Sequence, residues 1–161
     1  MKNITSILLL ILIVNSAIAQ SKSYQLLREK FQDEANVVSL ATSGFLARTV
    51  LWMAGEHEYT DAIRDIRKIR LTVIPVQAFK TNNVTLKGFK KLAKNDGFEE
   101  LAHVKDNGDD VTLLLQSESS SNKSNRYLLL VNSSNEVVVM EITGYIDPGI
   151  LLKDNEKIAF D

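Results

Sequence analysis

The chain has 161 residues, no cysteine, and 19 lysine and arginine residues against 20 aspartate and glutamate residues, for a formal net charge of −1. The absence of cysteine excludes disulfides, thiolate metal sites and cysteine nucleophiles, so the fold must depend on its apolar core. The length suits one domain, and the sequence contains no internal repeat.

The first 19 residues have the three parts of a cleavable export signal. Lys2 provides the positive start, residues 7–14 are an unbroken run of Ile, Leu and Val, and residues 17–19 read Ala-Ile-Ala, the pattern that signal peptidase accepts. The apolar run is shorter than the roughly 20 residues that span a bilayer. We therefore predict cleavage after Ala19, a single mature domain over residues 20–161 without a transmembrane segment, and a periplasmic or secreted location.

The first half of this domain is predicted to alternate helices with short strands. Ser23 can cap a helix whose apolar residues recur every three or four positions, namely Tyr24, Leu27, Phe31 and Ala35. Residues 37–41 then predict a strand, and a second helix lies between Gly44 and Gly55.

Two further helices and one strand complete this half. A third helix is predicted over residues 59–69, with Ala62, Ile63 and Ile66 facing inward, and it leads into a strand over residues 71–74. Pro75 ends that strand. Residues 85–94 predict an amphipathic helix whose inward residues are Leu86, Phe89, Leu92 and Ala93.

The second half consists of short apolar runs separated by polar turns, which predicts four consecutive antiparallel strands over residues 98–105, 111–116, 126–131 and 136–146. In the last strand Val138, Met140 and Ile142 alternate with polar residues, so we expect this apolar set to face the core. The fold class is therefore α+β: an antiparallel sheet built from the C-terminal four-strand meander and one or two N-terminal strands, with helices packed on one face.

Partial metal motifs occur twice, and each lacks a required ligand. His57 begins a sequence like the helical zinc motif of two histidines, but Asp61 occupies the place of the second histidine. Glu100 and His103 have the spacing of carboxylate-bridged metal sites, yet they fall on a predicted strand, where residues three apart face opposite sides. We assign no catalytic, cofactor-binding or metal-binding residue, and we expect no cofactor.

The net charge conceals an asymmetry along the chain. Residues 60–94 contain nine basic and two acidic side chains, a balance of +7, whereas residues 95–161 contain five basic and thirteen acidic ones, a balance of −8. Four lysines of the basic part share one face of the helix predicted over residues 85–94: Lys87, Lys90, Lys91 and Lys94. They are candidate contacts for an anionic surface, and the alternative is that they form a solvated helix face.

Several phrases of the sequence resemble one bacterial family. They are residues 98–108 (FEELAHVKDNG), residues 127–131 (YLLLV) and residues 141–147 (EITGYID), and together they resemble the family called domain of unknown function 4252, seen mainly in the Bacteroidetes. The resemblance implies an exported envelope protein of a Gram-negative bacterium. It implies no known activity, cofactor or catalytic residue.

The function that we predict is a non-enzymatic binding or interaction module of the cell envelope. Its partner is expected to be an unknown envelope protein or an anionic surface, and export argues against nucleic acid. Two alternatives remain open: a hydrolase or metal-assisted enzyme that uses His57 and His103, and a structural or envelope-stress role.

Overall fold

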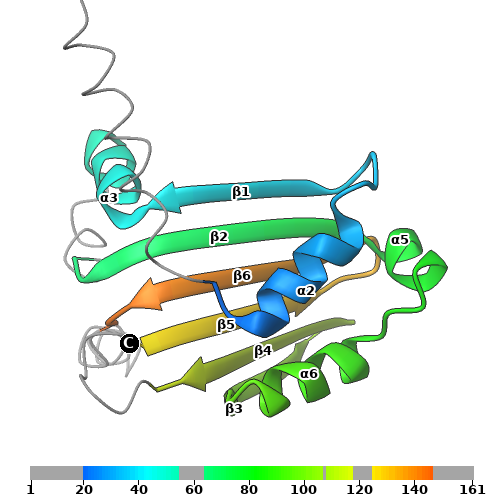
Figure 1. Ribbon diagram of the computed structural model, residues 1–161. Helices are drawn as coiled ribbons and strands as arrows, with labels where there is room; N and C mark the ends of the chain where they lie inside the picture. The colour runs from blue at the N-terminus through cyan, green and yellow to red at the C-terminus, as the bar shows by residue number, and fades with distance from the viewer. Residues whose placement is uncertain (1–19, 55–63, 107, 118–124, 147–161) are drawn as a thin grey trace, which may run out of the picture.

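A single six-stranded sheet organises the molecule (Figure 1). The computed structural model describes residues 20–54, 64–106, 108–117 and 125–146. Every neighbouring pair of strands is antiparallel, and the strand order is β1-β2-β6-β5-β4-β3. The strands are β1 (Val38–Ser43), β2 (Ile66–Pro75), β3 (Glu99–Asp106), β4 (Asp109–Gln116), β5 (Asn125–Asn132) and β6 (Glu136–Gly144). The predicted α+β class is confirmed, with the meander β3 to β6 extended by β2 and β1.

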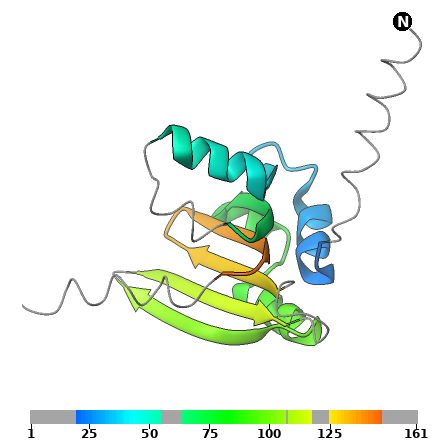
Figure 2. The same ribbon diagram turned by 90° about the vertical axis from the view of Figure 1, so that its left-hand side faces the viewer.

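Within the described residues, three helices cover one face of this sheet: α2 (Lys22–Phe31), α5 (Val76–Thr81) and α6 (Leu86–Asn95). The fourth, α3 (Gly44–Met53), follows β1 at the edge of the sheet and projects to the side away from α2 (Figure 2). We call the face under α2, α5 and α6 the covered face and the other the open face. Among the described residues, no helix combines the length and the apolar composition that crossing a bilayer requires.

The core lies between the covered face and its helices. Phe31 of α2 stacks on Phe79 of α5, with ring centroids 5.2 Å apart. Phe89 and Ala93 of α6 are buried against the same cluster, as the amphipathic pattern predicts. Leu114, Leu128, Leu130, Val137 and Val139 supply the sheet side of this core.

A buried ion pair fastens the start of α2 to the sheet. Nη1 of Arg70 in β2 lies 2.6 Å from Oε1 of Glu141 in β6, and the side chain of Glu141 has no exposed surface. The second carboxylate oxygen of Glu141 accepts a hydrogen bond from the backbone amide of Ser21 at 2.8 Å. The Ser21 side chain caps α2, so the predicted cap at Ser23 is wrong by two residues. The Ser23 hydroxyl is buried instead and donates to Asp96, and Ala35 lies beyond the helix.

The helix predicted over residues 59–69 is wrong in its last part. Residues 55–63, which include Ala62 and Ile63, lie outside the described residues. Ile66 begins β2, a ten-residue strand that pairs with β1 on one side and β6 on the other. The three-residue spacing of Ile66 and Ile69 also fits one face of a helix. The segment forms a strand because it pairs with β1 and β6. The helix α5 was not predicted.

The orientation predicted for the last strand is also wrong. Val137, Val139, Glu141 and Thr143 are the buried set of β6, whereas Val138, Met140 and Ile142 are half-buried and belong to the open face. This orientation has a physical cause. Glu141 is the only charged residue between Val137 and Thr143, and it can be buried because it forms an ion pair with Arg70. The predicted turn after Pro148 lies outside the described residues.

A candidate anion-binding hollow beside helix α6

Helix α6 presents its lysines to solvent because its apolar stripe fixes its rotation. The Thr85 side chain caps the helix by accepting a hydrogen bond from the Gly88 amide at 3.0 Å. Phe89 and Ala93 are 3% and 0% exposed. With that stripe against the sheet, the four predicted lysines fall on the remaining side of the helix.

These lysines line a hollow of about 760 Å³ between α6 and the β3–β4 hairpin. The hairpin contributes His103, Lys105 and Asp110, and the helix contributes Lys87, Lys90, Lys91 and Lys94. Of the described residues that line it, Asp110 alone carries a carboxylate. The structure thus brings the four candidate lysines together with His103, and the hollow holds five lysines against one acid.

Asp110 lies among these cations and is bonded to several of them. Its Oδ1 is 2.9 Å from His103 Nε2 and 3.6 Å from Lys90 Nζ, and its Oδ2 is 3.8 Å from Lys105 Nζ. Partial burial opposes ionisation of this carboxyl, but the charges of Lys90, His103 and Lys105 together outweigh that effect and lower its pKa below the usual value. Asp110 therefore contacts His103 and Lys105 of β3 as well as Lys90 of α6, and its single charge offsets only part of the charge of the five lysines.

The structure corrects one expectation about Glu100 and His103. A bulge between Glu100 and Ala102 shifts the register, so that Glu100 lies opposite Leu114 and His103 lies opposite Thr112. Leu114 and Thr112 share a face of β4, which puts Glu100 and His103 on the same side of the sheet rather than on opposite sides. His57, the other histidine of the enzyme alternative, lies outside the described residues. In the described ranges no three His, Asp or Glu side chains are grouped as metal ligands.

The sequence contained a signal for the hairpin residues that the prediction did not use. A two-residue turn at residues 107 and 108 pairs residue 106 with 109 and residue 105 with 110, and the structure has this register. Lys105 and Asp110 were therefore predictable as cross-strand neighbours. Their approach to the lysines of α6 was not, because it depends on how the helix crosses the sheet.

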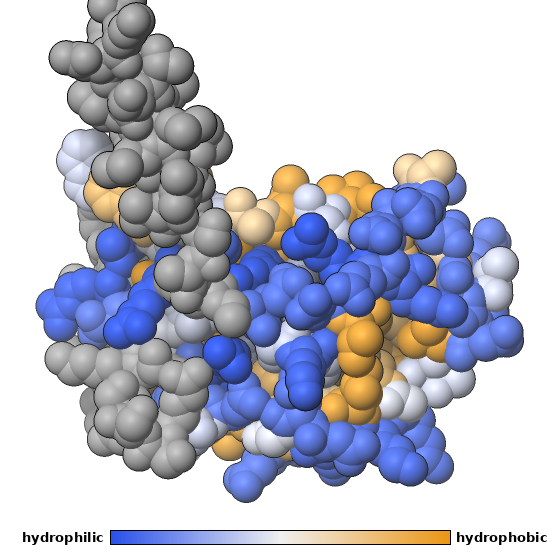
Figure 3. Space-filling model, in the orientation of Figure 1, coloured by the Kyte–Doolittle hydropathy of each residue, from blue (hydrophilic) through white to orange (hydrophobic). Residues whose placement is uncertain are grey.

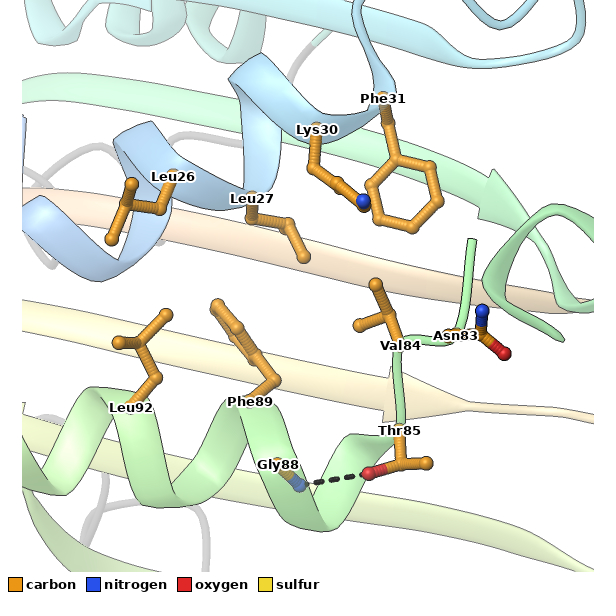
Figure 4. Close-up of a pocket in the computed structure, with 10 residues that line it drawn as sticks. All are labelled: Leu26, Leu27, Lys30, Phe31, Asn83, Val84, Thr85, Gly88, Phe89 and Leu92. Carbon is orange, nitrogen blue, oxygen red and sulfur yellow. Dashed lines mark hydrogen bonds between the residues drawn. The ribbon is translucent and has the colours of Figure 1, made fainter. Parts of the chain in front are cut away.

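A second hollow lies on the other flank of α6, where the helix faces α2. This groove, about 380 Å³ in volume, is walled by apolar side chains that point toward one another from the two helices, including Leu26, Leu27, Phe89 and Leu92 (Figure 4). Lys30 stands at its rim. In the space-filling view, a stripe of apolar residues interrupts the otherwise hydrophilic surface of the helical side (Figure 3). Thr85 and Gly88 line both the groove and the basic hollow, so the two are contiguous at the start of α6.

Residues 17–151 match the model of a family described as a domain of unknown function, DUF4252. No curated protein and no solved structure matches the chain.

Proposed function

We propose that this chain, which belongs to the DUF4252 family, is a non-enzymatic binding module that holds anionic lipid headgroups in the basic hollow beside α6. The observation that carries the proposal is the convergence of five lysines and His103, from a helix and a hairpin, on one hollow with a single carboxylate. Lysine ammonium groups bind phosphate oxygens through charge and hydrogen bonds without requiring one fixed geometry. Such a site suits a phosphate-bearing headgroup.

The adjoining apolar groove favours a lipid over a free anion. Inorganic phosphate needs only the lysines, whereas a lipid also presents hydrocarbon. The groove between α2 and α6 offers apolar walls beside the lysines, and the two hollows meet at Thr85 and Gly88. The proposal places the protein in the periplasm or outside the cell, where export would bring it into contact with envelope lipids.

Vesicle co-sedimentation tests this function. The test variant reverses Lys87, Lys91 and Lys94 to glutamate, since all three are exposed, and leaves Lys90, which is paired with Asp110. The control variant makes the same charge change at three exposed basic residues away from the hollow, Lys22, Arg28 and Lys80. Each lysine near an anionic bilayer contributes about 1 kcal/mol, so the test variant should bind about a hundredfold more weakly than the wild type.

Two further measurements, the salt dependence of binding and competition by inorganic phosphate, distinguish headgroup binding from the binding of a small free anion. Binding should weaken between low and physiological salt, because the Debye length shrinks from about 30 Å at 0.01 M to about 8 Å at 0.15 M. Inorganic phosphate should compete no better than chloride at equal ionic strength. Equal loss in both variants, or no sedimentation with anionic vesicles at low salt, contradicts the proposal, and strong competition by phosphate assigns the hollow to a free anion.

A further inference from the structure

The open face of the sheet is more apolar than the face that the helices cover. Most of its side chains form three cross-strand rows of six, and the register also places Pro75, Glu136 and Asp109 on this face, beyond the first row. The first row is Val38, Val73, Val138, Val131, Val111 and Val104; the second is Leu40, Leu71, Met140, Leu129, Leu113 and Ala102; the third is Thr42, Ile69, Ile142, Tyr127, Leu115 and Glu99. Apart from Thr42 and Glu99, both on edge strands, and the hydroxyl of the buried Tyr127, the rows are apolar.

The covered face is of mixed character, because polar side chains are buried there beside the apolar core. Its buried side chains include Arg70, Glu141, Thr72 and Thr112. When one face of an antiparallel sheet is in water, that face normally carries the polar residues. In this sheet several polar and charged residues lie under the helices, and the apolar rows lie on the open face. This distribution indicates that the open face is itself covered in the functional state of the protein.

Helix α3 enlarges this apolar surface. It projects on the open-face side (Figure 2), and Phe45, Trp52 and Met53 are 67%, 64% and 76% exposed. At the two edges of the sheet, Val38 and Val104 are more than half exposed as well. A monomeric soluble protein rarely presents a continuous apolar surface of this extent.

The size of the face suits a second protein surface. Six strands about 4.8 Å apart and three rows about 6.8 Å apart span roughly 600 Å². The side chains of α3 bring the apolar surface close to the roughly 800 Å² per partner of a stable interface.

The 15-residue segment after the last described residue is too short to do the same. The segment after Ile146 has 15 residues. Even as one continuous helix, 15 residues are about 22 Å long and about 10 Å wide, which covers about two of the six strands.

Charge selects the kind of partner. The three rows contain no lysine or arginine, so nothing on them attracts an anionic lipid or an acidic protein. Their one charged residue, Glu99, is on the edge strand β3, so the centre of the face carries no charge that would repel an identical face. Two apolar sheet faces pack about 10 Å apart by interdigitating their side chains. We propose that two copies of this chain pack open face against open face, which leaves the helices and the basic hollow of each copy on the outside of the dimer.

Sedimentation velocity of the purified protein tests this association. The test variant is Met140→Lys, at the centre of the open face. The matched control is Leu26→Lys, an apolar side chain that is 49% exposed on the helical side. At about 100 µM, a dimer with a Kd of about 1 µM is essentially fully formed. The wild type and Leu26→Lys should sediment as dimers and Met140→Lys as a monomer, with the same circular dichroism spectrum.

Cross-linking keeps the proposal testable should Met140→Lys fail to fold. The chain has no cysteine, so Leu129→Cys places one thiol near the centre of the open face. A short bis-maleimide should join two such chains. Absence of the cross-linked dimer overturns the proposal.

Other occupants of the face give different results, and each overturns the dimer. A wild-type protein that sediments as a monomer at about 100 µM overturns the dimer by itself. If deleting residues 147–161 turns that monomer into a dimer, the C-terminal segment covers the face. If the monomer co-sediments with neutral phosphatidylcholine vesicles, lipid covers it. Dimerisation of Met140→Lys equal to that of the wild type also excludes the open face as the interface.

Discussion

At the scale of single residues, Glu141 is the clearest case of a charge that the fold cannot lose. It is fully buried, and its two oxygens are bonded to Arg70 and to the backbone amide of Ser21. Glu141→Gln replaces the carboxylate that pairs with Arg70 by a neutral amide, and breaking a buried ion pair costs about 3 to 5 kcal/mol. We expect a loss of that size in urea unfolding. Glu136→Gln, at an exposed position of the same strand, should change the stability little, and equal losses would contradict this account.

Asp110 connects the basic hollow to the pH dependence of stability. Because its pKa is lower in the folded protein than in the unfolded chain, the unfolded chain binds more protons near pH 4. The contribution of Asp110 is therefore present above the unfolded value of about 3.9 and is lost as the pH falls through the folded pKa. Asp110→Asn should abolish that part of the acid sensitivity in urea titrations. It should also strengthen vesicle binding, since it removes the one carboxylate that lines the hollow.

At the scale of elements, two glycines with positive φ make a matched pair. Gly144 ends β6 at φ 142°, and a Cβ there would collide with the backbone of Asp65 and Ile66. Gly108, in the β3–β4 turn at φ 98°, has open space around the same position. Gly108→Ala should cost only the conformational strain, about 1 to 2 kcal/mol. Gly144→Ala adds an overpacking cost of about 1 to 3 kcal/mol. Urea unfolding of both variants measures the difference, and equal losses would refute the close approach at Gly144.

Local patterns predicted the elements whose signals lie within a few residues. The apolar stripe that includes Phe89 and Ala93 predicted α6, and apolar runs between polar turns predicted the meander. The first half of β2 was missed because Ile66 and Ile69 are spaced for a helix as well as for a strand, and the choice depends on pairing with distant β1 and β6. The buried face of β6 was inverted for a related reason, since the partner of Glu141 is 71 residues away.

The candidate site was predictable to the same limited degree. Periodicity alone placed the four lysines on one helical face. Their convergence with His103 and Asp110 depends on the packing of α6 beside the hairpin, and the bulge before Ala102 reverses the side to which Glu100 points. No local pattern encodes either feature.

At the scale of the whole molecule, α2 begins a few residues after the predicted export cleavage site. Ser21 lies two residues after Ala19, and its backbone amide donates a hydrogen bond to Glu141. Removal of residues 1–19 would leave this contact intact. We expect mass spectrometry of the protein from the periplasmic or culture fraction to give a mature chain that begins at Gln20, and Ala19→Leu to block processing. Recovery of the wild type as an intact chain from Met1 in the membrane pellet would contradict the prediction.

The proposed dimer makes the stability of the whole molecule depend on its concentration. If unfolding of the dimer also separates the chains, mass action raises the unfolding midpoint as the protein concentration rises. We expect the Tm of the wild type and of Leu26→Lys to increase across a hundredfold range of concentration. Met140→Lys, whose fold still rests on the covered face and its helices, should have a lower Tm that does not change over the same range. When unfolding and dissociation of a dimer are coupled, the Tm must depend on protein concentration. A wild-type Tm that does not change with concentration would therefore mean that association through the open face does not stabilise the protein.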